Sequence, residues 1–272
     1  MSSASNPPPT ARLEGKVAII TGGASGIGEA ATRLFVRHGA AVVVADVQDE
    51  LGRQVVASMG SWRERVRYRR CDVREEEQVA ETVRYAVREF GRLDVMVSNA
   101  GTIEPYASIL DLDMAALERA MATNVRGVAA TIKHAARAMV AQGVRGSIIC
   151  TGSVAGCLGG SGPHEYTASK HAVVGLVRSA CSELGRRGIR VNCISPFGVA
   201  TPLACAVYGQ EPREVEQACG EAANLKGLVL RADHVAEAAL FLASDESAYV
   251  SGLNLTVDGG VSVVAHLCRS PT

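Results

Sequence analysis

Seven short runs rich in β-branched residues recur along the chain, and most are followed by a segment with the spacing of an amphipathic helix. Strands that alternate with helices indicate repeated βαβ units, which build a parallel sheet with helices on both faces. The sequence therefore predicts an α/β protein with a doubly wound Rossmann fold and a seven-stranded parallel sheet. The predicted strands lie in KVAII, AVVVAD, VRYRRCDV, LDVMVSNA, GSIICTGS, IRVNCISP and LNLTVDGG.

In such a sheet, right-handed crossovers bring the carboxyl ends of the strands to one edge, where open α/β sheets bind their ligands. Residues far apart in the sequence are therefore expected to converge there. The residues at these predicted ends are Gly22, Asp46, Asp72, Asn99, Ser153 and Pro196.

One domain is expected, because α/β folds of this length commonly form around a single sheet. We predict a disordered arm over residues 1–14 and a single Rossmann-type domain over residues 15–272. A long segment of polar and small residues, at about 201–226, interrupts the alternation. Because long insertions often act as lids, we interpret it as a helical flap over a substrate; an ordinary pair of surface helices is the alternative.

The glycine-rich segment TGGASGIG, at residues 21–28, follows the first predicted strand and precedes a helical pattern. Gly22, Gly26 and Gly28 allow a tight turn and the close approach of a pyrophosphate, which the amides at the helix start would stabilise. Glycine turns are common, so the segment alone is weak evidence. The second predicted strand, however, ends at Asp46, where a carboxylate can accept hydrogen bonds from a ribose 2′-hydroxyl. Together these features predict a dinucleotide site.

Tyr166 and Lys170 are four residues apart in HEYTASKHAVVGL, and Ser153 lies thirteen residues before the tyrosine. In a helix the two side chains would be neighbours, so the ammonium could favour the ionised phenol and lower its pKa from about 10. This combination predicts a proton-transfer site. Taken alone, Ser153 could equally be a turn residue and Asn124 could simply bond backbone.

With these motifs in view, the chain from about Gly15 to Gly260 resembles the short-chain dehydrogenase/reductase family. Longer stretches such as KHAARAM and YVSGLNLTVDGG are similar to plant enzymes of specialised metabolism, the group of secoisolariciresinol dehydrogenase, xanthoxin dehydrogenase and momilactone A synthase. The resemblance implies a catalytic tetrad of Asn124, Ser153, Tyr166 and Lys170, and a homotetramer. The cofactor positions that it implies are Gly22, Ser25, Gly26, Ile27, Gly28, Asp46, Val47, Asp72, Val73, Asn99, Ala100, Gly101, Tyr166, Lys170, Val199 and Thr201.

Two positions depart from the family pattern. Ser98 stands where an asparagine is usual, and Phe197 stands where a glycine usually follows the proline, so its ring is expected to project toward the nicotinamide or the substrate. The pocket is expected to be mostly apolar, which suits a terpenoid, phenylpropanoid or steroid-like alcohol. Its candidate residues are Ile103, Val154, Cys157, Leu158, Phe197, Leu203 and Tyr208.

The resulting functional prediction is the NAD-dependent oxidation of a secondary alcohol of an apolar specialised metabolite to a ketone or lactone. Asp46, followed by Val47 and not by a basic residue, disfavours the 2′-phosphate of NADP. Two alternatives remain: an NADPH-dependent ketone reductase, and a dinucleotide-binding regulator without catalysis. An intact tetrad argues against the regulator.

Composition excludes several other classes of function. The 28 basic and 28 acidic residues leave no net charge to attract nucleic acid or an anionic membrane. We interpret the basic run at residues 63–70 as a solvent-exposed segment that leads into a strand. Eight cysteines without CxxC pairs or His/Cys ligand spacing indicate reduced thiols and no metal site. The cytoplasm is the expected location, with a plastid address in the Ser-containing N-terminus as the alternative.

Overall fold

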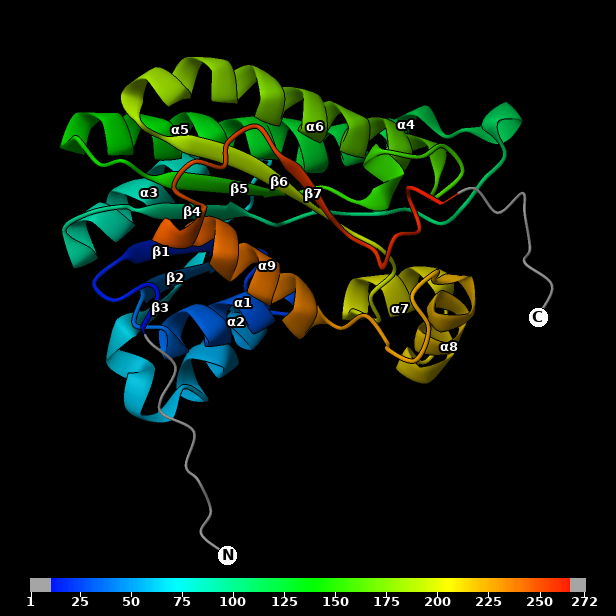
Figure 1. Cartoon of the computed structure of the whole chain (residues 1–272), viewed down its shortest axis with the longest axis horizontal. Helices are drawn as coiled ribbons and strands as arrows, with labels where there is room; N and C mark the ends of the chain where they lie inside the picture. Colours follow the sequence, from blue (N-terminus) through cyan, green and yellow to red (C-terminus); the bar gives the residue numbers. More distant parts are fainter. Residues whose placement is uncertain (1–10, 265–272) are drawn as a thin grey trace, which may run out of the picture.

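The computed structural model describes residues 11–264, which contain one sheet of seven parallel strands in the order β3-β2-β1-β4-β5-β6-β7 (Figure 1). Each predicted run overlaps one of these strands, so the predicted seven-stranded sheet is confirmed. The strand order reverses between β1 and β4, which makes this the switch point where such sheets bind ligands. The strands are β1 (Val17–Thr21), β2 (Ala41–Asp46), β3 (Val66–Arg70), β4 (Val95–Ser98), β5 (Ser147–Thr151), β6 (Arg190–Pro196) and β7 (Asn254–Val257).

Helices cover both faces of the sheet, as the doubly wound prediction requires. Helices α1, α2 and α9 pack on one face, and α3, α5 and α6 pack on the other (Figure 1). The nine helices of the described part are α1 (Gly26–Arg37), α2 (Asp49–Ala57), α3 (Glu76–Phe90), α4 (Met114–Met121), α5 (Gly127–Gln142), α6 (His164–Leu184), α7 (Pro202–Tyr208), α8 (Pro212–Ala222) and α9 (Ala232–Ala243).

The two cores follow from the period-two geometry of a strand. Ala18 and Ile20 of β1 belong to the core under α1 and α9, whereas Ile19 between them belongs to the core under α3, α5 and α6. Successive strand side chains point to opposite faces, so a strand covered on both sides must be apolar throughout. This explains why the central strands read as continuous apolar runs.

Two segments were predicted besides the sheet and its helices, an N-terminal arm and a flap. Residues 1–10 of the predicted arm lie outside the described residues. Residues 11–14 are described, and Leu13 is fully buried with its N–H bonded to the His38 carbonyl at 2.9 Å, so folded structure begins before residue 15. The predicted flap contains α7 and α8, which lie beside the carboxyl-terminal edge of the sheet (Figure 1). Across residues 11–264 no helix combines the length and apolarity that a membrane span requires.

Candidate active site and dinucleotide cradle

The glycine-rich turn joins the end of β1 directly to the start of α1. Gly22 and Gly26 have φ of 64° and 53°, a region that favours glycine. A Cβ on Gly28 would overlap the Gly22 carbonyl and lie 2.8 Å from Asn99 Nδ2. The side chain of Ser25, the N-cap of α1, accepts no hydrogen bond from the first helical amides. With glycine at positions 22, 26 and 28, the turn forms a backbone cradle that fits a pyrophosphate.

Asp46 ends β2 beside this cradle. Its carboxylate is buried, accepting hydrogen bonds from Ala24 N–H at 3.0 Å through Oδ2 and from Gln48 N–H at 3.0 Å through Oδ1. These bonds fix the carboxylate next to the glycine turn, where a ribose would follow the pyrophosphate. Val47, the next residue, is exposed.

The third strand end carries Asp72 and Val73. The Asp72 carboxylate pairs with Arg74, 2.6 Å from Nη2, and this hydrogen-bonded guanidinium holds the pKa of Asp72 below its usual range. Val73 is buried against Gly127 of α5, where a Cβ would lie 2.8 Å from the valine side chain. Both residues therefore have fixed positions at the expected adenine end of the site.

Asn99, directly after β4, is hydrogen-bonded to the ends of the two neighbouring strands, β1 and β5. Its Nδ2 donates to the Thr21 carbonyl at 3.1 Å, and its Oδ1 accepts from Thr151 Oγ1 at 3.1 Å. Thr21 Oγ1 also accepts from the amides of Asn99 and Ala100. Thr21 and Thr151 were not among the predicted site residues. Their signal was available, because Thr21 directly follows the predicted strand KVAII and Thr151 lies near the end of GSIICTGS.

Lys170 and Tyr166 lie on adjacent turns of α6. Lys170 is 4% exposed, and its Nζ lies 5.3 Å from the Tyr166 ring centroid while donating to the Thr151 carbonyl at 2.8 Å. The short 3₁₀ turn that follows Ser153 packs closely against this helix, since a Cβ on Gly156 would lie 2.8 Å from the Lys170 carbonyl. Ser153 Oγ caps that turn by accepting from Ala155 N–H at 3.2 Å. The fold thus gathers the predicted serine, tyrosine and lysine in one region.

Asn124 completes the predicted group from a π-helical turn, Ala122–Arg126, between α4 and α5. It is fully buried; Oδ1 accepts from Thr102 N–H at 2.8 Å, and Nδ2 donates to the Thr102 carbonyl at 2.9 Å and Ser169 Oγ at 3.0 Å. A Cβ on Gly101 would lie 3.3 Å from Asn124 Oδ1 and 3.7 Å from Lys170 Nζ. Asn124 therefore adjoins the lysine and also bonds backbone. The π-turn, a feature often found at functional sites, was not predicted.

The base of the flap reaches the glycine turn. Thr201 caps α7 by accepting from Ala204 N–H at 3.3 Å, and its methyl would lie 3.1 Å from a Cβ on Gly26. Val199, just before it, is buried. The predicted cofactor positions in this segment thus lie beside the cradle.

The candidate pocket residues do not share one environment. Val154 is buried, Ile103 and Leu158 are half-buried, and the Cys157 thiol accepts from Asn254 Nδ2 at 3.1 Å. Leu203 and Tyr208 are exposed on α7. Burial, and then the neighbouring Tyr166, raise the pKa of Tyr208, which puts this flap residue within electrostatic reach of the predicted base.

Phe197 lies under the flap. It lines a cavity of about 60 Å³ between the end of β6 and α8, and its N–H bonds to the Val257 carbonyl at 3.1 Å. Phe197 therefore lines this cavity together with Cys219 and Gly220 of α8. The cavity is lined by Phe197, Gly198, Cys219, Gly220, Ala223, Leu225, Leu228, Leu230, Asp258 and Gly259.

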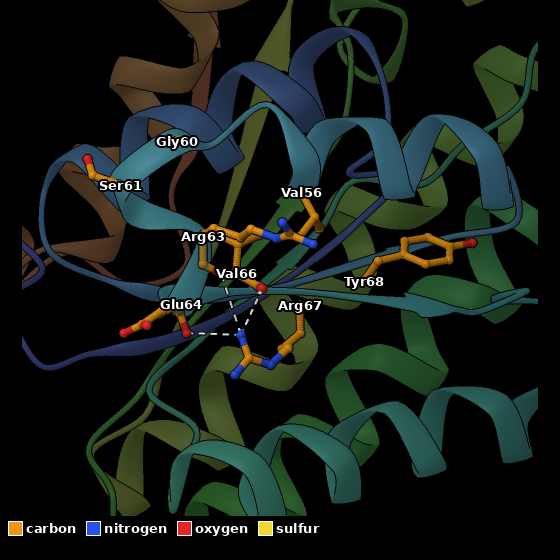
Figure 2. Close-up of a pocket in the computed structure, with 8 residues that line it drawn as sticks. All are labelled: Val56, Gly60, Ser61, Arg63, Glu64, Val66, Arg67 and Tyr68. Carbon is orange, nitrogen blue, oxygen red and sulfur yellow. Dashed lines mark hydrogen bonds between the residues drawn. The ribbon is translucent and has the colours of Figure 1, made fainter.

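A larger depression, of about 600 Å³, lies beside the edge strand β3, near the amino end where that strand begins (Figure 2). Figure 2 shows Arg67 held over it by hydrogen bonds to the Glu64 and Val66 carbonyls. None of its lining residues belongs to the predicted tetrad or cradle. They are Val56, Gly60, Ser61, Arg63, Glu64, Val66, Arg67 and Tyr68.

Comparison with known proteins decides the family. Residues 22–262 match the family model described as enoyl-(acyl carrier protein) reductase. The chain is 60% identical to short-chain dehydrogenase reductase 3b of Arabidopsis thaliana, over 93% of this chain and 98% of that protein. The chain belongs to the short-chain dehydrogenase/reductase family. It is also 53% identical to momilactone A synthase of Oryza sativa subsp. japonica, over 93% of this chain and 92% of that protein.

A solved structure supports the same assignment. The crystal structure of levodione reductase superposes with a TM-score of 0.85 at 30% identity, covering 93% of this chain and all of that chain. As a short-chain dehydrogenase/reductase the protein is an oxidoreductase, and its Rossmann fold implies a nicotinamide dinucleotide cofactor. Within residues 11–264, no cluster of three His, Cys, Asp or Glu side chains could hold a metal ion.

Proposed function

We propose that the protein oxidises a secondary alcohol of an apolar terpenoid or lignan to a ketone or lactone, with NAD as the oxidant. The observation that carries the proposal is the buried Lys170 ammonium, 5.3 Å from the ring centroid of Tyr166 and adjacent to Asn124. A cation beside a phenol stabilises the negative charge that forms there when a proton is transferred, so Lys170 can assist Tyr166 in proton transfer.

A nicotinamide dinucleotide held by the glycine turn and Lys170 would supply the acceptor for the hydride of the carbon that carries the hydroxyl. Tyr166 takes the hydroxyl proton at its phenolate oxygen. Ser153 Oγ donates a hydrogen bond to the substrate oxygen and orients it. Lys170 stabilises the phenolate and binds the nicotinamide ribose, and Asn124 fixes the neighbouring backbone at Thr102. The cradle of Gly22, Gly26 and Gly28 would hold the pyrophosphate.

We propose NAD as the cofactor because Asp46 is buried and fixed by the Ala24 and Gln48 amides. A carboxylate held there can accept from the ribose hydroxyls, but it would repel a 2′-phosphate. Asp72, Val73, Asn99, Val199 and Thr201 occupy the remaining strand ends and would contact adenine, ribose and carboxamide.

The proposed substrate class rests on the apolar candidate pocket residues and on relatives such as momilactone A synthase. Val154, Leu158, Leu203 and Phe197 are apolar, and contact with such side chains favours an apolar ligand. A charged metabolite would lose hydration there without gaining a partner.

We propose further that the enzyme is a homotetramer in the cytoplasm. Small residues along α5 and α6, such as Ala129 and Gly175, would permit close approach of helices from a second subunit. The free cysteines suit a reducing compartment. Light scattering should give about four times the 28.4 kDa chain mass, and a stable 28.4 kDa particle at micromolar concentration would exclude the tetramer.

The decisive experiment replaces Tyr166 with Phe, which removes the proton-accepting oxygen and keeps the ring. With NAD and a panel of terpenoid and lignan alcohols, kcat should fall by about 10²- to 10⁴-fold, the usual contribution of a general base, with NADH affinity unchanged. Tyr249→Phe is the matched control, because Tyr249 is fully exposed. Residual activity above a few per cent of the parent rate would show that another group accepts the substrate proton.

A further inference from the structure

The turn between β2 and α2, residues 46–49, is attached from the side to the edge strand β3. Asp46 pairs in register with Arg70, the last residue of β3, and the Asp46 carbonyl accepts from Cys71 N–H at 2.9 Å. This turn carries the carboxylate that we assign to the adenosine ribose. Side chains of β3 therefore determine what surrounds that ribose.

Tyr68 of β3 binds the turn at residues 46–49 through its hydroxyl group. Its hydroxyl lies 2.9 Å from the Asp46 carbonyl and 2.8 Å from Asp49 Oδ1, and shares its hydrogen between them. A Cβ on Gly52 would overlap the Tyr68 ring, so α2 packs directly on that ring. Figure 2 shows the Tyr68 side chain extending away from Arg63 and Arg67, with its hydroxyl at the far end.

Arg70 is a cation at the ribose end of the site, and its guanidinium is already bound. Nη1 donates to the Val47 carbonyl at 2.6 Å and to Asp49 Oδ2 at 3.1 Å. The Asp49 carboxylate thus binds Tyr68 through one oxygen and Arg70 through the other. The Tyr68 hydrogen bond and the Arg70 charge hold the pKa of Asp49 below its usual range, so it is ionised at neutral pH.

We propose that Asp49 is a second determinant of the choice of NAD over NADP, because it holds the Arg70 guanidinium against Val47 and neutralises its charge. This inference rests on the proposed cofactor site. Asp46 would repel a 2′-phosphate directly. Asp49 acts through Arg70, which would otherwise supply a bidentate cationic donor to that phosphate. Arg70 is a positioning and specificity residue here and takes no part in the chemistry.

The charges around the turn support this division of roles. A 2′-phosphate brings close to two negative charges near neutral pH. With Asp49 ionised, Arg70 and Asp49 together present no net charge to it. Replacing Asp49 with Asn keeps the side-chain shape and one acceptor oxygen for Tyr68, but it leaves the Arg70 charge uncompensated. The freed cation can then turn from the neutral Val47 carbonyl to the phosphate.

The test is a set of dissociation constants for NADH and NADPH, measured by nicotinamide fluorescence without any alcohol. The proteins are the parent, Asp49→Asn, Arg70→Gln and the double variant. Asp49→Asn should improve NADPH affinity relative to NADH about fivefold, the size of one exposed charge pair. Arg70→Gln alone should leave the ratio unchanged, and the double variant should lose the gain.

Arg53 provides the matched control, since it lies one helical turn from Asp49 on α2 and is also exposed. Asp49→Asn combined with Arg53→Gln should retain the gain, which shows that Arg70 and not general positive charge is responsible. An unchanged ratio in Asp49→Asn, with NADH bound normally, would overturn this inference alone. A parent protein that binds neither dinucleotide would overturn the proposed function and this inference together.

Discussion

Glu165 directly precedes the proposed base and is only 4% exposed, yet its Oε1 has no hydrogen-bond partner among the described residues. On α6 it lies one turn before Ser169, whose hydroxyl bonds to Asn124. A buried oxygen without a partner costs about 1–3 kcal/mol, and an uncompensated charge costs more. The helix that holds the catalytic pair therefore carries a destabilising group in its first turn.

Replacing Glu165 with Met should raise the stability of the protein by about 1 kcal/mol, because a side chain of similar length fills the space without a polar atom. Urea unfolding followed by circular dichroism measures the change. Glu183→Met, at an exposed position of the same helix, should leave the midpoint within error. Destabilisation by Glu165→Met would mean that the carboxylate is satisfied in solution, for instance by bound water.

At the scale of elements, the central strands could be predicted because burial on both faces requires apolar runs, and such runs are visible in the sequence. The π-turn at Asn124 and the position of Phe197 were not, because each depends on contacts with other elements. The Phe197 ring was expected near the nicotinamide or substrate; in the structure Phe197 lines a cavity under α8. Whether the ring also contacts substrate stays a prediction.

The contact between β6 and α8 provides a test of the flap. A Cβ on Gly198 would overlap Cys219 Sγ, so Gly198→Ala should displace α8 from the sheet. If the flap covers the substrate, kcat/KM for bulky alcohols should fall about tenfold, equivalent to about 1.4 kcal/mol, with NADH affinity unchanged. Gly220→Ala on α8 itself adds its Cβ in open space and should preserve the rate. Equal kcat/KM values in both variants would show that the flap takes no part in substrate binding.

For the whole molecule, the candidate site assembles from the ends of five strands and the base of the flap. Parallel strands share one edge, which is why Gly22, Asp46, Asp72, Asn99 and Ser153 could be predicted to converge from their order alone. The side-chain pairs that hold those ends could not. Tyr68 with Asp49, for example, is separated by nineteen residues, and no periodicity relates the two.

Because the site draws on most of the sheet, a bound dinucleotide should stabilise the domain as one unit. At a hundred times its Kd, NADH adds about 2.7 kcal/mol to the unfolding free energy. Unfolding entropy of about 2.1 cal/mol/K per residue gives about 0.57 kcal/mol/K for 272 residues, so Tm should rise by about 5 °C in a single transition.

Gly28→Ala should abolish that rise, because its Cβ would overlap the Gly22 carbonyl and disrupt the cradle. Gly185→Ala is the control, since a Cβ there has open space just after α6, and it should keep the full shift. Scanning calorimetry with and without NADH measures both variants against the parent. Two separate transitions in the parent, only one of which moves with NADH, would mean that residues 15–272 do not unfold as one domain. A full shift in Gly28→Ala would locate the dinucleotide away from the glycine turn.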